Sequence, residues 1–233
     1  MNIALFGYGK MGKMLEQLGK NRGHDIVAKI DEDASNIPYA QFDVAIDFST
    51  PDSAFNNITA CFAHGVPVIS GTTGWLDRYD EAVDQCVEKN GAFIYASNFS
   101  LGVNLFFELN KRLAQMMANV DSYKVAMEEI HHTQKLDAPS GTAITLAEGI
   151  IANSEYSGWT LEKETNGNIP IVAKRVGTVP GTHSISYESP VDTLEIKHTA
   201  HNREGFALGA LIAAEWIQGK KGVFTMQDVL NLH

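Results

Sequence analysis

The residues best suited to chemistry lie close together near the middle of the chain. Two imidazoles and an amine precede three small or hydroxylated residues that can begin a helix: His131, His132, Lys135, Ser140, Gly141 and Thr142. An imidazole titrates near neutral pH and an amine can donate a proton, so this segment can take part in proton transfer. The free amides at the start of a helix can also hold an anion. The segment therefore predicts a pocket for a small anionic molecule that needs a proton.

The elements on either side of this segment must position these groups. Residues 123–130 predict a strand that ends at the two histidines. Because successive side chains on a strand point to opposite faces, we expect the two imidazoles to have different roles. Downstream, residues 139–151 predict a helix that Ser140 or Thr142 can cap. The apolar residues at helical spacing in this run are Ala143, Leu146, Ala147, Ile150 and Ile151.

A glycine-rich segment near the start of the chain has the order of elements that binds a dinucleotide. Residues 2–6 predict a strand, which is followed by a G-x-G-x-x-G pattern and a helix-forming run to about Leu18. The pattern comprises Gly7, Tyr8, Gly9, Lys10, Met11 and Gly12. Its glycines permit a tight turn and a close approach of the backbone to a pyrophosphate. A second strand over residues 25–30 ends at Asp31, where a carboxylate can bind the hydroxyls of the adenine ribose.

The residues after Asp31 bear on the choice between NADH and NADPH. An arginine at this point would accommodate the 2′-phosphate of NADPH, but Glu32 and Asp33 follow instead. Lys10 is the one nearby cation in the glycine loop that could compensate. We therefore expect a preference for NADH, or use of both cofactors with weak discrimination.

Strands and helices alternate through the rest of the N-terminal half. Strands are predicted over residues 44–48, 66–70 and 92–96, with helices over residues 51–63 and 76–87 between them. This alternation is typical of a parallel sheet with helices on both faces, whose ligands bind at the carboxyl ends of the strands. Small polar segments follow three of these strands. Each segment alone is typical of a turn, but the three segments together predict the part of the site that binds the nicotinamide. The three segments are Phe48, Ser49 and Thr50, then Gly71, Thr72, Thr73 and Gly74, and finally Ser97, Asn98, Phe99 and Ser100.

A predicted amphipathic helix over residues 103–117 leads into a segment of different character. Alternating residues on two strands predict an antiparallel or mixed sheet, open on one side unless another subunit covers it. These residues are His183, Ile185 and Tyr187 on one strand, and Leu194, Ile196 and His198 on the next. Residues 154–167 predict a polar loop, residues 206–218 a helix, and Thr225 the cap of a short final helix.

The expected fold class is therefore α/β with two domains. Residues 1–100 and 204–233 should form a Rossmann-type, doubly wound parallel sheet that binds the dinucleotide. Residues 101–203 should form an inserted α+β domain with a mixed or antiparallel sheet, which is expected to bind the substrate.

The overall composition limits the partners and the compartment. A net charge of −10 argues against nucleic acid or an anionic membrane as the main partner. No apolar stretch approaches the ~20 residues of a membrane span, and the N-terminus lacks the pattern of a signal peptide. Cys61 and Cys86 lie in predicted helices without metal-ligand spacing, as expected of reduced cysteines in a cytoplasmic protein.

The histidines could also indicate a zinc site. However, no cysteine is near them, and no carboxylate–histidine spacing matches a known ligand set. We therefore expect no metal, and we interpret His183 and His198 as hydrogen-bonded core histidines on apolar strand faces. Asp137 precedes Ala-Pro and is expected to shape the turn rather than to take part in chemistry.

The segment from Glu129 to Ala143 resembles the corresponding segment of the dihydrodipicolinate reductases. These enzymes are also called 4-hydroxy-tetrahydrodipicolinate reductases and belong to the diaminopimelate route to lysine. The resemblance covers essentially the whole chain, and the segment around the histidines is highly specific. Its other parts are residues 7–12, 47–49, 71–74 and 97–104, Arg175, and residues 198–207.

The resemblance implies a reduced nicotinamide cofactor, NADH or NADPH, that lies across Gly7–Gly12, Gly71–Thr73 and Ala96–Phe99. It also implies hydride transfer to a cyclic, unsaturated dicarboxylate. It implies that His131 and Lys135 handle protons and that Arg203 helps to line the pocket. The residues that it assigns to the substrate carboxylate are His132, Ser140, Gly141 and Thr142. It also implies a homotetramer in which the second domains, residues 101–203, join the subunits by pooling their sheets. The chain departs from many members in its shorter length, in the missing arginine after Asp31, and in Gln134, which replaces a histidine and is left out of catalysis.

Two other functions are compatible with parts of this pattern. An amino-acid dehydrogenase of similar build, such as one that oxidises aspartate, would reduce NAD⁺ with that amino acid. A regulatory protein could bind NADH without turnover, although such a sensor has no need of the proton donors His131 and Lys135.

Overall fold

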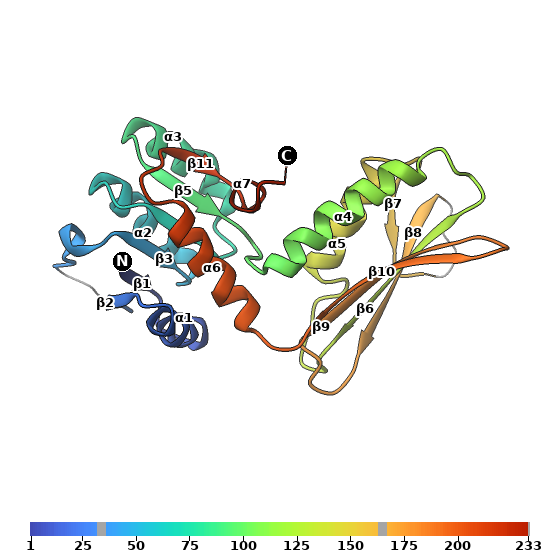
Figure 1. Ribbon diagram of the computed structural model, residues 1–233, viewed down its shortest axis with the longest axis horizontal. Coiled ribbons are helices and arrows are strands. Elements are labelled where there is room, and N and C mark those ends of the chain that lie inside the picture. Colours follow the sequence, from blue (N-terminus) through green and yellow to red (C-terminus); the bar gives the residue numbers. More distant parts are fainter. Residues whose placement is uncertain (32–35, 163–166, 233) are drawn as a thin grey trace. The chain divides into compact units, whose positions relative to one another are not determined.

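The computed structural model describes residues 1–31, 36–162 and 167–232. The chain divides into two compact units, Met1–Leu101 with Glu204–His233, and Gly102–Arg203. The second unit is thus inserted between the two parts of the first. Each unit has its own sheet (Figure 1).

The described part of the first unit contains a six-stranded sheet in the order β11-β5-β4-β3-β1-β2. All neighbouring strands are parallel. The strands are β1 (Asn2–Phe6), β2 (Asp25–Ile30), β3 (Val44–Asp47), β4 (Val68–Ser70), β5 (Ala92–Tyr95) and β11 (Gly222–Phe224). The helices are α1 (Lys10–Asn21), α2 (Pro51–Ala63), α3 (Tyr79–Glu88), α6 (Glu204–Trp216) and α7 (Met226–Leu230), with 3₁₀ turns at η1 (Tyr39–Gln41) and η2 (Leu76–Arg78).

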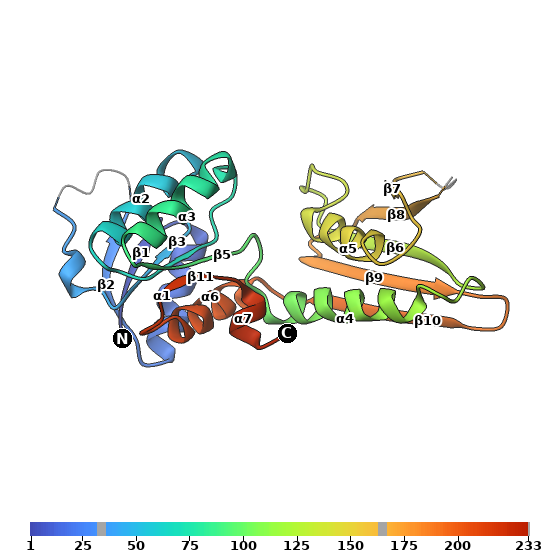
Figure 2. The same cartoon turned by 90° about the horizontal axis from the view of Figure 1, so that it is seen from above.

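Helices cover both faces of this sheet (Figure 2). One core cluster joins the sheet to α1 and α6 through side chains such as Leu15 and Leu211, and a second joins it to α2 and α3 through Ile58 and Cys86. The four inner strands β1, β3, β4 and β5 are buried on both faces, as a doubly wound parallel sheet requires, while the edge strands β2 and β11 are more exposed. The predicted Rossmann-type fold is therefore confirmed.

The second unit contains, among its described residues, a five-stranded sheet in the order β10-β9-β6-β8-β7. Strand β6 is parallel to β8 and antiparallel to β9, so the sheet is mixed, as predicted. The strands are β6 (Lys124–His131), β7 (Gly158–Thr160), β8 (Asn168–Arg175), β9 (Gly181–Glu188) and β10 (Thr193–Ala200). Helices α4 (Leu101–Met117) and α5 (Gly141–Ile151) pack on one core cluster with β6, β8 and β9.

Most predicted elements are confirmed, and the strands over residues 2–6 and 25–30 have the predicted ends. The predicted helix over residues 76–87 instead begins as a 3₁₀ turn, in which the Arg78 amide donates to the carbonyl of Trp75, and continues as α3. Strand β4 begins after Pro67, because proline has no amide hydrogen for the sheet ladder.

The prediction of a polar loop over residues 154–167 is wrong for residues 158–160. These residues form β7, which pairs in parallel with the start of β8. The pairing satisfies backbone groups that an unpaired edge of β8 would leave exposed. Residues 163–166 lie outside the described part of the chain.

Two further sequence expectations concern the helices. No helix in the described part of the chain is long and apolar enough to cross a membrane. Cys61 on α2 and Cys86 on α3 are both buried and free, as expected of reduced structural cysteines.

Candidate active site

The first unit has a cavity of about 430 Å³ at the carboxyl ends of β1, β2 and β3. Its lining contains the first part of the glycine pattern together with polar residues from the ends of the neighbouring strands. These lining residues are Gly7, Tyr8, Gly9, Ile30, Asp31, Ile37, Phe48, Ser49, Thr50, Ser53 and Asn57. Ligands of doubly wound sheets bind at this edge, so the cavity lies where a dinucleotide is expected.

The three glycines of the pattern fit such a ligand for different reasons. Gly7 has a φ of +85°, and a Cβ atom there would lie 2.2 Å from the carbonyl oxygen of Phe48. A Cβ atom on Gly12 would lie 2.4 Å from the carbonyl oxygen of Gly7. Gly9, by contrast, has no described atom within 4 Å of such a Cβ, and it caps α1 without a side-chain hydrogen bond. The turn is therefore tight, while the position of Gly9 at the start of α1 is open, as a close approach of a pyrophosphate to the backbone would require.

A buried carboxylate, that of Asp47, fixes two of the segments predicted to bind the cofactor. One of its oxygens accepts hydrogen bonds from the hydroxyls of Ser70 and Thr72, at 2.9 and 2.7 Å. The other accepts from Ser49 at 2.6 Å and from Asn57 at 3.2 Å. Burial raises the pKa of Asp47, while the bonds from Ser49 and Thr72 lower it.

The segment after β4 lies close to the segment after β3. The Ser49 amide donates to the Thr72 hydroxyl at 2.9 Å. A Cβ atom on Gly71 would lie 2.2 Å from the ring of Phe48, so this position requires glycine. Thr73 is exposed beside them.

The remaining predicted cofactor residues lie at the other strand ends or on α1. After β5, Ala96 and Asn98 are half-buried, Ser97 is exposed, and the buried Phe99 packs against Phe48 at a ring distance of 6.0 Å. Asp31 is exposed after β2, Lys10 is exposed at the start of α1, and Tyr8 and Met11 are half-buried. Glu32 and Asp33, on which the expected NADH preference rests, lie outside the described residues.

In the second unit, β6 buries every second side chain. The buried positions near its end are Met127, Glu129 and His131, and Glu129 is 0% exposed. His132 follows the strand and is half-buried. The two histidines therefore have different environments, as expected, and His131 shares its face with a carboxylate that the sequence interpretation did not use.

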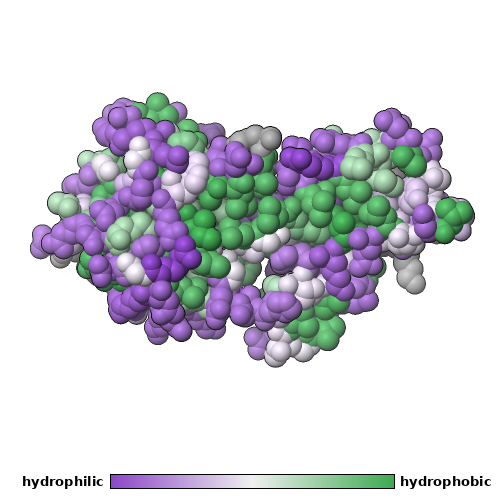
Figure 3. Space-filling model, in the orientation of Figure 1, coloured by the Kyte–Doolittle hydropathy of each residue, from purple (hydrophilic) through white to green (hydrophobic). Residues whose placement is uncertain are grey.

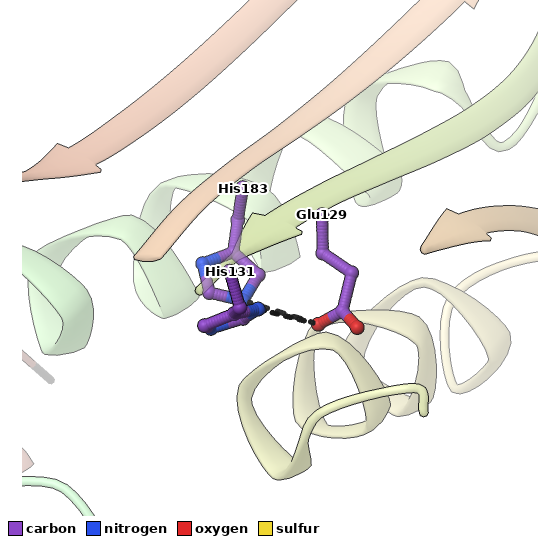
Figure 4. Close-up of side chains that lie close together, drawn as sticks. All are labelled: Glu129, His131 and His183. Carbon is purple, nitrogen blue, oxygen red and sulfur yellow. Dashed lines mark ion pairs between the residues drawn. The ribbon is translucent and has the colours of Figure 1, made fainter. Parts of the chain in front are cut away.

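Several groups converge on the carboxylate of Glu129 (Figure 4). Its Oε2 atom accepts a hydrogen bond from the Ser140 amide at 3.0 Å and lies 3.4 Å from Nδ1 of His131 and 3.7 Å from Nε2 of His183. Its Oε1 atom lies 3.1 Å from Nη2 of Arg175. Burial raises the pKa of Glu129, but His183, Ser140 and His131 together lower it to about 2. Glu129 is therefore ionised at neutral pH.

His131 is neutral at the same pH. Its burial lowers the pKa to about 4, Glu129 opposes this shift, and the positive potentials of His183, Lys135 and Arg175 add to it. Nδ1 lies within ion-pair distance of Glu129 but has no hydrogen bond of good geometry among the described residues. A Cβ atom on Gly181 would lie 3.1 Å from Nε2, so glycine there leaves room for this edge of the ring.

The segment after β6 carries Lys135 and is held by a second set of contacts. Nζ of Lys135 lies 2.9 and 2.8 Å from the two carboxylate oxygens of Asp137. The Lys135 ammonium holds the pKa of Asp137 below its usual value. Asp137 was expected only to shape the turn, but its carboxylate is the partner of the candidate proton donor. Ala138 and Pro139 are joined by a cis peptide bond.

Helix α5 begins at the predicted serine. Ser140 caps the helix, because its hydroxyl accepts a hydrogen bond from the Ala143 amide at 3.2 Å, and the same hydroxyl lies 3.1 Å from Nε2 of His183. Gly141 and Thr142 occupy the first two helical positions, whose amides have no partner within a helix. Gly141 is exposed and Thr142 is half-buried. This end of α5 can therefore hold an anion.

The predicted core histidines differ from each other. His183 is buried and hydrogen-bonded, as expected, but its partners belong to the Glu129 cluster. His198 is half-buried against the ring of Phe106, and burial lowers its pKa.

The structure does not join Arg203 to the Glu129 cluster. Arg203 is exposed after β10, and no described contact links it to His131 or Lys135. His132 has a buried Nδ1 atom without a hydrogen-bond partner among the described residues. Gln134 is exposed.

Glu129, His131 and His183 also offer metal-ligand atoms within 4.8 Å of one another. The Glu129 carboxylate, however, already pairs with the Arg175 guanidinium and accepts the Ser140 amide. A cation at this point would have to displace or repel that guanidinium. The cluster is better satisfied by its own donors than by a metal ion.

Comparison with known proteins agrees with this arrangement. A family description for the N-terminus of dihydrodipicolinate reductase matches residues 1–99, and one for the C-terminus matches residues 102–230. The 4-hydroxy-tetrahydrodipicolinate reductase of Christiangramia forsetii is 58% identical over 234 residues, which cover 99% of this chain and 98% of the relative. This chain belongs to the dihydrodipicolinate reductase family.

Other members of the dihydrodipicolinate reductase family are more distant. The 4-hydroxy-tetrahydrodipicolinate reductase of Rhodopseudomonas palustris is 39% identical over 83% of this chain and 74% of the relative. The dipicolinate-bound dihydrodipicolinate reductase of a Paenisporosarcina species has a TM-score of 0.78 and 24% identity, with 98% of each chain covered. The latter similarity establishes the shared fold.

Proposed function

We propose that this member of the dihydrodipicolinate reductase family reduces 4-hydroxy-tetrahydrodipicolinate to tetrahydrodipicolinate with NADH or NADPH, in the diaminopimelate route to lysine. The observation that carries this proposal is the 58% identity, over nearly the whole of both chains, with a curated 4-hydroxy-tetrahydrodipicolinate reductase. The Paenisporosarcina relative binds dipicolinate, which is a small cyclic dicarboxylate, and this supports the same substrate class here.

The first unit would hold the cofactor. Its tight glycine turn and the open space at Gly9 support binding of the pyrophosphate by residues 7–12, and Asp31 would bind the adenine ribose. The network around Asp47 supports a role for residues 71–73, and residues 96–99 would complete the nicotinamide side. When bound, the reduced nicotinamide supplies the hydride.

The second unit would hold the substrate and supply the proton. The amides of Gly141 and Thr142 and the hydroxyl of Ser140 would bind one carboxylate, and His132 and Arg203 would bind or line the other. Hydride addition leaves electron density on the substrate that a proton must neutralise. Lys135 carries an ammonium suited to this transfer, while the neutral His131 can take up and release a proton.

We also propose that NADH is preferred. Asp31 is exposed at the end of β2, where the ribose hydroxyls are expected. Lys29 on the same strand already pairs with the carboxylate of Glu16 at 2.7 Å, so a 2′-phosphate would have to compete with Glu16 for its ammonium. The ratio of kcat/KM for NADH and NADPH tests this proposal, and a strong preference for NADPH would contradict it.

The proposed homotetramer rests on the exposed apolar surface of the second unit. Leu105, Leu109 and Met116 are 49%, 51% and 74% exposed along one side of α4, where apolar side chains gather in Figure 3. Among the described residues, the helices α4 and α5 pack on one face of the sheet, and we propose that a partner subunit covers the other face. Light scattering after size-exclusion chromatography measures the assembly, and a monomer at micromolar concentration would contradict it.

The Glu129 cluster also bears on whether the reaction needs a metal ion. The reaction should not need a metal, since the Glu129 cluster is satisfied by Arg175 and Ser140. Dialysis against a chelator should therefore leave kcat unchanged.

We place the enzyme in the cytoplasm, where free cysteines such as Cys61 and Cys86 are usual.

The experiment that tests the proposed function follows NADH oxidation while the substrate is generated in place from pyruvate and aspartate semialdehyde by the preceding synthase. We expect oxidation that depends on both precursors. Reduction of NAD⁺ by aspartate would favour an amino-acid dehydrogenase instead. Binding of NADH without turnover of any cyclic imine dicarboxylate would favour a regulatory protein.

A further inference from the structure

The second unit contains an ion pair between Glu129 on β6 and Arg175 on β8, with an Nη2–Oε1 distance of 3.1 Å. The Glu129 side chain is 0% exposed and that of Arg175 is 21% exposed. The register of the sheet brings the two residues together, because His131 is paired with Arg175 and Glu129 with His183. The carboxylate is thus held between the ends of three strands.

Glu129 connects two parts of the proposed catalytic machinery. Its Oε2 atom accepts the Ser140 amide at 3.0 Å and therefore fixes the N-terminus of α5. The same atom faces Nδ1 of His131 at 3.4 Å. A carboxylate in this place favours the proton on Nδ1 of the neutral ring, since a lone pair there would be repelled. Nε2, which lies beside Gly181, is then the atom that gains and loses a proton.

Arg175 connects the pair to the segment that carries the other proton donor. Its Nε atom donates to the carbonyl oxygen of Lys135 at 3.2 Å, and its Nη2 atom donates to that of Asp137 at 2.5 Å. A guanidinium can make these bonds and the ion pair together, because its donors point in several fixed directions. The backbone on both sides of Leu136 is therefore tied to Glu129 through one side chain.

We propose that Glu129 and Arg175 are positioning residues of this reductase. Glu129 sets the tautomer of His131 and the start of α5, and Arg175 sets the segment with Lys135. The inference rests on the proposed function and adds two residues that act through others. Burial of an ion pair has a desolvation cost, and a hydrophobic pair could join β6 and β8 equally well. The positioning role gives a reason for the charged pair.

The neighbouring pair on the same strands provides a matched control. Lys174 on β8 forms an ion pair with Glu128 on β6, and their side chains are 50% and 34% exposed. Strand alternation places Glu128 on the opposite face of the sheet from Glu129. Loss of this pair removes a link between the same two strands without touching His131 or Lys135.

The test compares Glu129→Gln and Arg175→Met with Glu128→Gln and Lys174→Met. We expect the first two to lower kcat by roughly 10–100-fold, the scale of residues that orient a reacting ligand, with an unchanged Kd for NADH. The two controls should retain wild-type kcat once light scattering shows that they form the same assembly as the wild type, because Glu128 lies on the sheet face proposed to meet a partner subunit. Arg175→Lys should not restore kcat, because an ammonium cannot make the same set of bonds.

A spectroscopic measurement separates positioning from stability. The ¹⁵N chemical shifts of the His131 ring should report a proton on Nδ1 in the wild type and a mixture of tautomers in Glu129→Gln. Glu129→Asp keeps the negative charge but moves it away from His131, because the aspartate side chain is shorter. This variant should fold and show an intermediate kcat. Wild-type kcat and an unchanged tautomer in a folded Glu129 variant would overturn the inference. Absence of turnover by the wild type would instead contradict the proposed function.

Discussion

Nζ of Lys135 lies 2.8 and 2.9 Å from the two carboxylate oxygens of Asp137, two residues further along the chain. The pair limits the rotation of the amine, because Nζ is held between the two oxygens. The backbone of both residues is in turn held by Arg175. The candidate proton donor is therefore oriented by its own segment of chain as well as by the sheet.

Asp137→Asn removes this partner but leaves the amine in place. We expect kcat to fall by about threefold to tenfold, because only the orientation of the ammonium is lost. Lys135→Met should lower kcat by about 10²–10⁴-fold, since the proton donor itself is lost. Steady-state kinetics with saturating cofactor measures both. An Asp137→Asn enzyme as slow as Lys135→Met would show that Asp137 takes a direct part in the reaction.

Two glycines at helix starts provide a crossed test of the two binding sites. A Cβ atom on either Gly9 or Gly141 meets no described atom within 4 Å, so both alanine variants should fold. Gly9→Ala should lower Tm slightly, because Gly9 is the N-cap of α1 and alanine is less favourable than glycine there. Gly9→Ala should raise KM for the cofactor and Gly141→Ala should raise KM for the substrate, each by roughly tenfold, as expected for the loss of about 1.4 kcal/mol of binding. The opposite pattern, or a change in both constants for each variant, would contradict the assignment of the two sites.

Ser140→Ala should weaken both the helix and the site. The variant loses the cap of α5 and the hydroxyl beside His183, and a lost cap costs about 1 kcal/mol. Chemical denaturation should detect this loss, and KM for the substrate should rise. Thr142→Ala is the control for the cap, because Thr142 does not cap the helix and its variant should retain the stability of the wild type.

The stability of the second unit should fall in acid in two overlapping steps. The pKa of His131 is about 4 in the folded chain against an ordinary 6.5, so the unfolded chain binds this proton first and stability is lost as the pH falls from 6.5 to 4. The pKa of Glu129 is about 2 against 4.5, so its stabilisation is present above pH 4.5 and is lost as the pH falls toward 2.

The free energy of unfolding between pH 7 and pH 4 tests this expectation. His131→Asn removes the first titrating group and should flatten the curve between pH 6.5 and 4. Gln134→Ala, a change of an exposed side chain that does not titrate, should leave the curve parallel to that of the wild type. A curve for His131→Asn that is as steep as that of the wild type would mean that another group controls the loss.

Much of the fold follows from local patterns in the sequence. The strand over residues 2–6, the glycine turn and the strand over residues 25–30 are fixed by apolar runs and by glycines that the turn requires. The cap of α5 at Ser140 follows from the onset of an apolar period. Strand β7 could not be predicted in the same way, because its pairing with β8 depends on an edge that only the folded sheet provides.

The candidate site shows the same division. His131, Lys135 and Ser140 stand out by their types and spacing within one segment. Glu129 and Arg175 come together only through the register of β6 and β8, which local sequence does not determine. One feature of the sequence does indicate a buried partner for Glu129. Glu129 alternates with Met127 and His131 on the buried face of β6, where an unpaired carboxylate would be costly.

The most direct test of the central claim measures both turnover and cofactor binding for the wild type, His131→Ala and Lys135→Met. The account predicts that the wild type oxidises NADH with the cyclic dicarboxylate substrate and that both variants are slower by about 100-fold or more, while all three bind NADH with the same Kd. A folded wild type that binds NADH but does not turn over this substrate would contradict the account. So would variants of either residue that retain the wild-type rate.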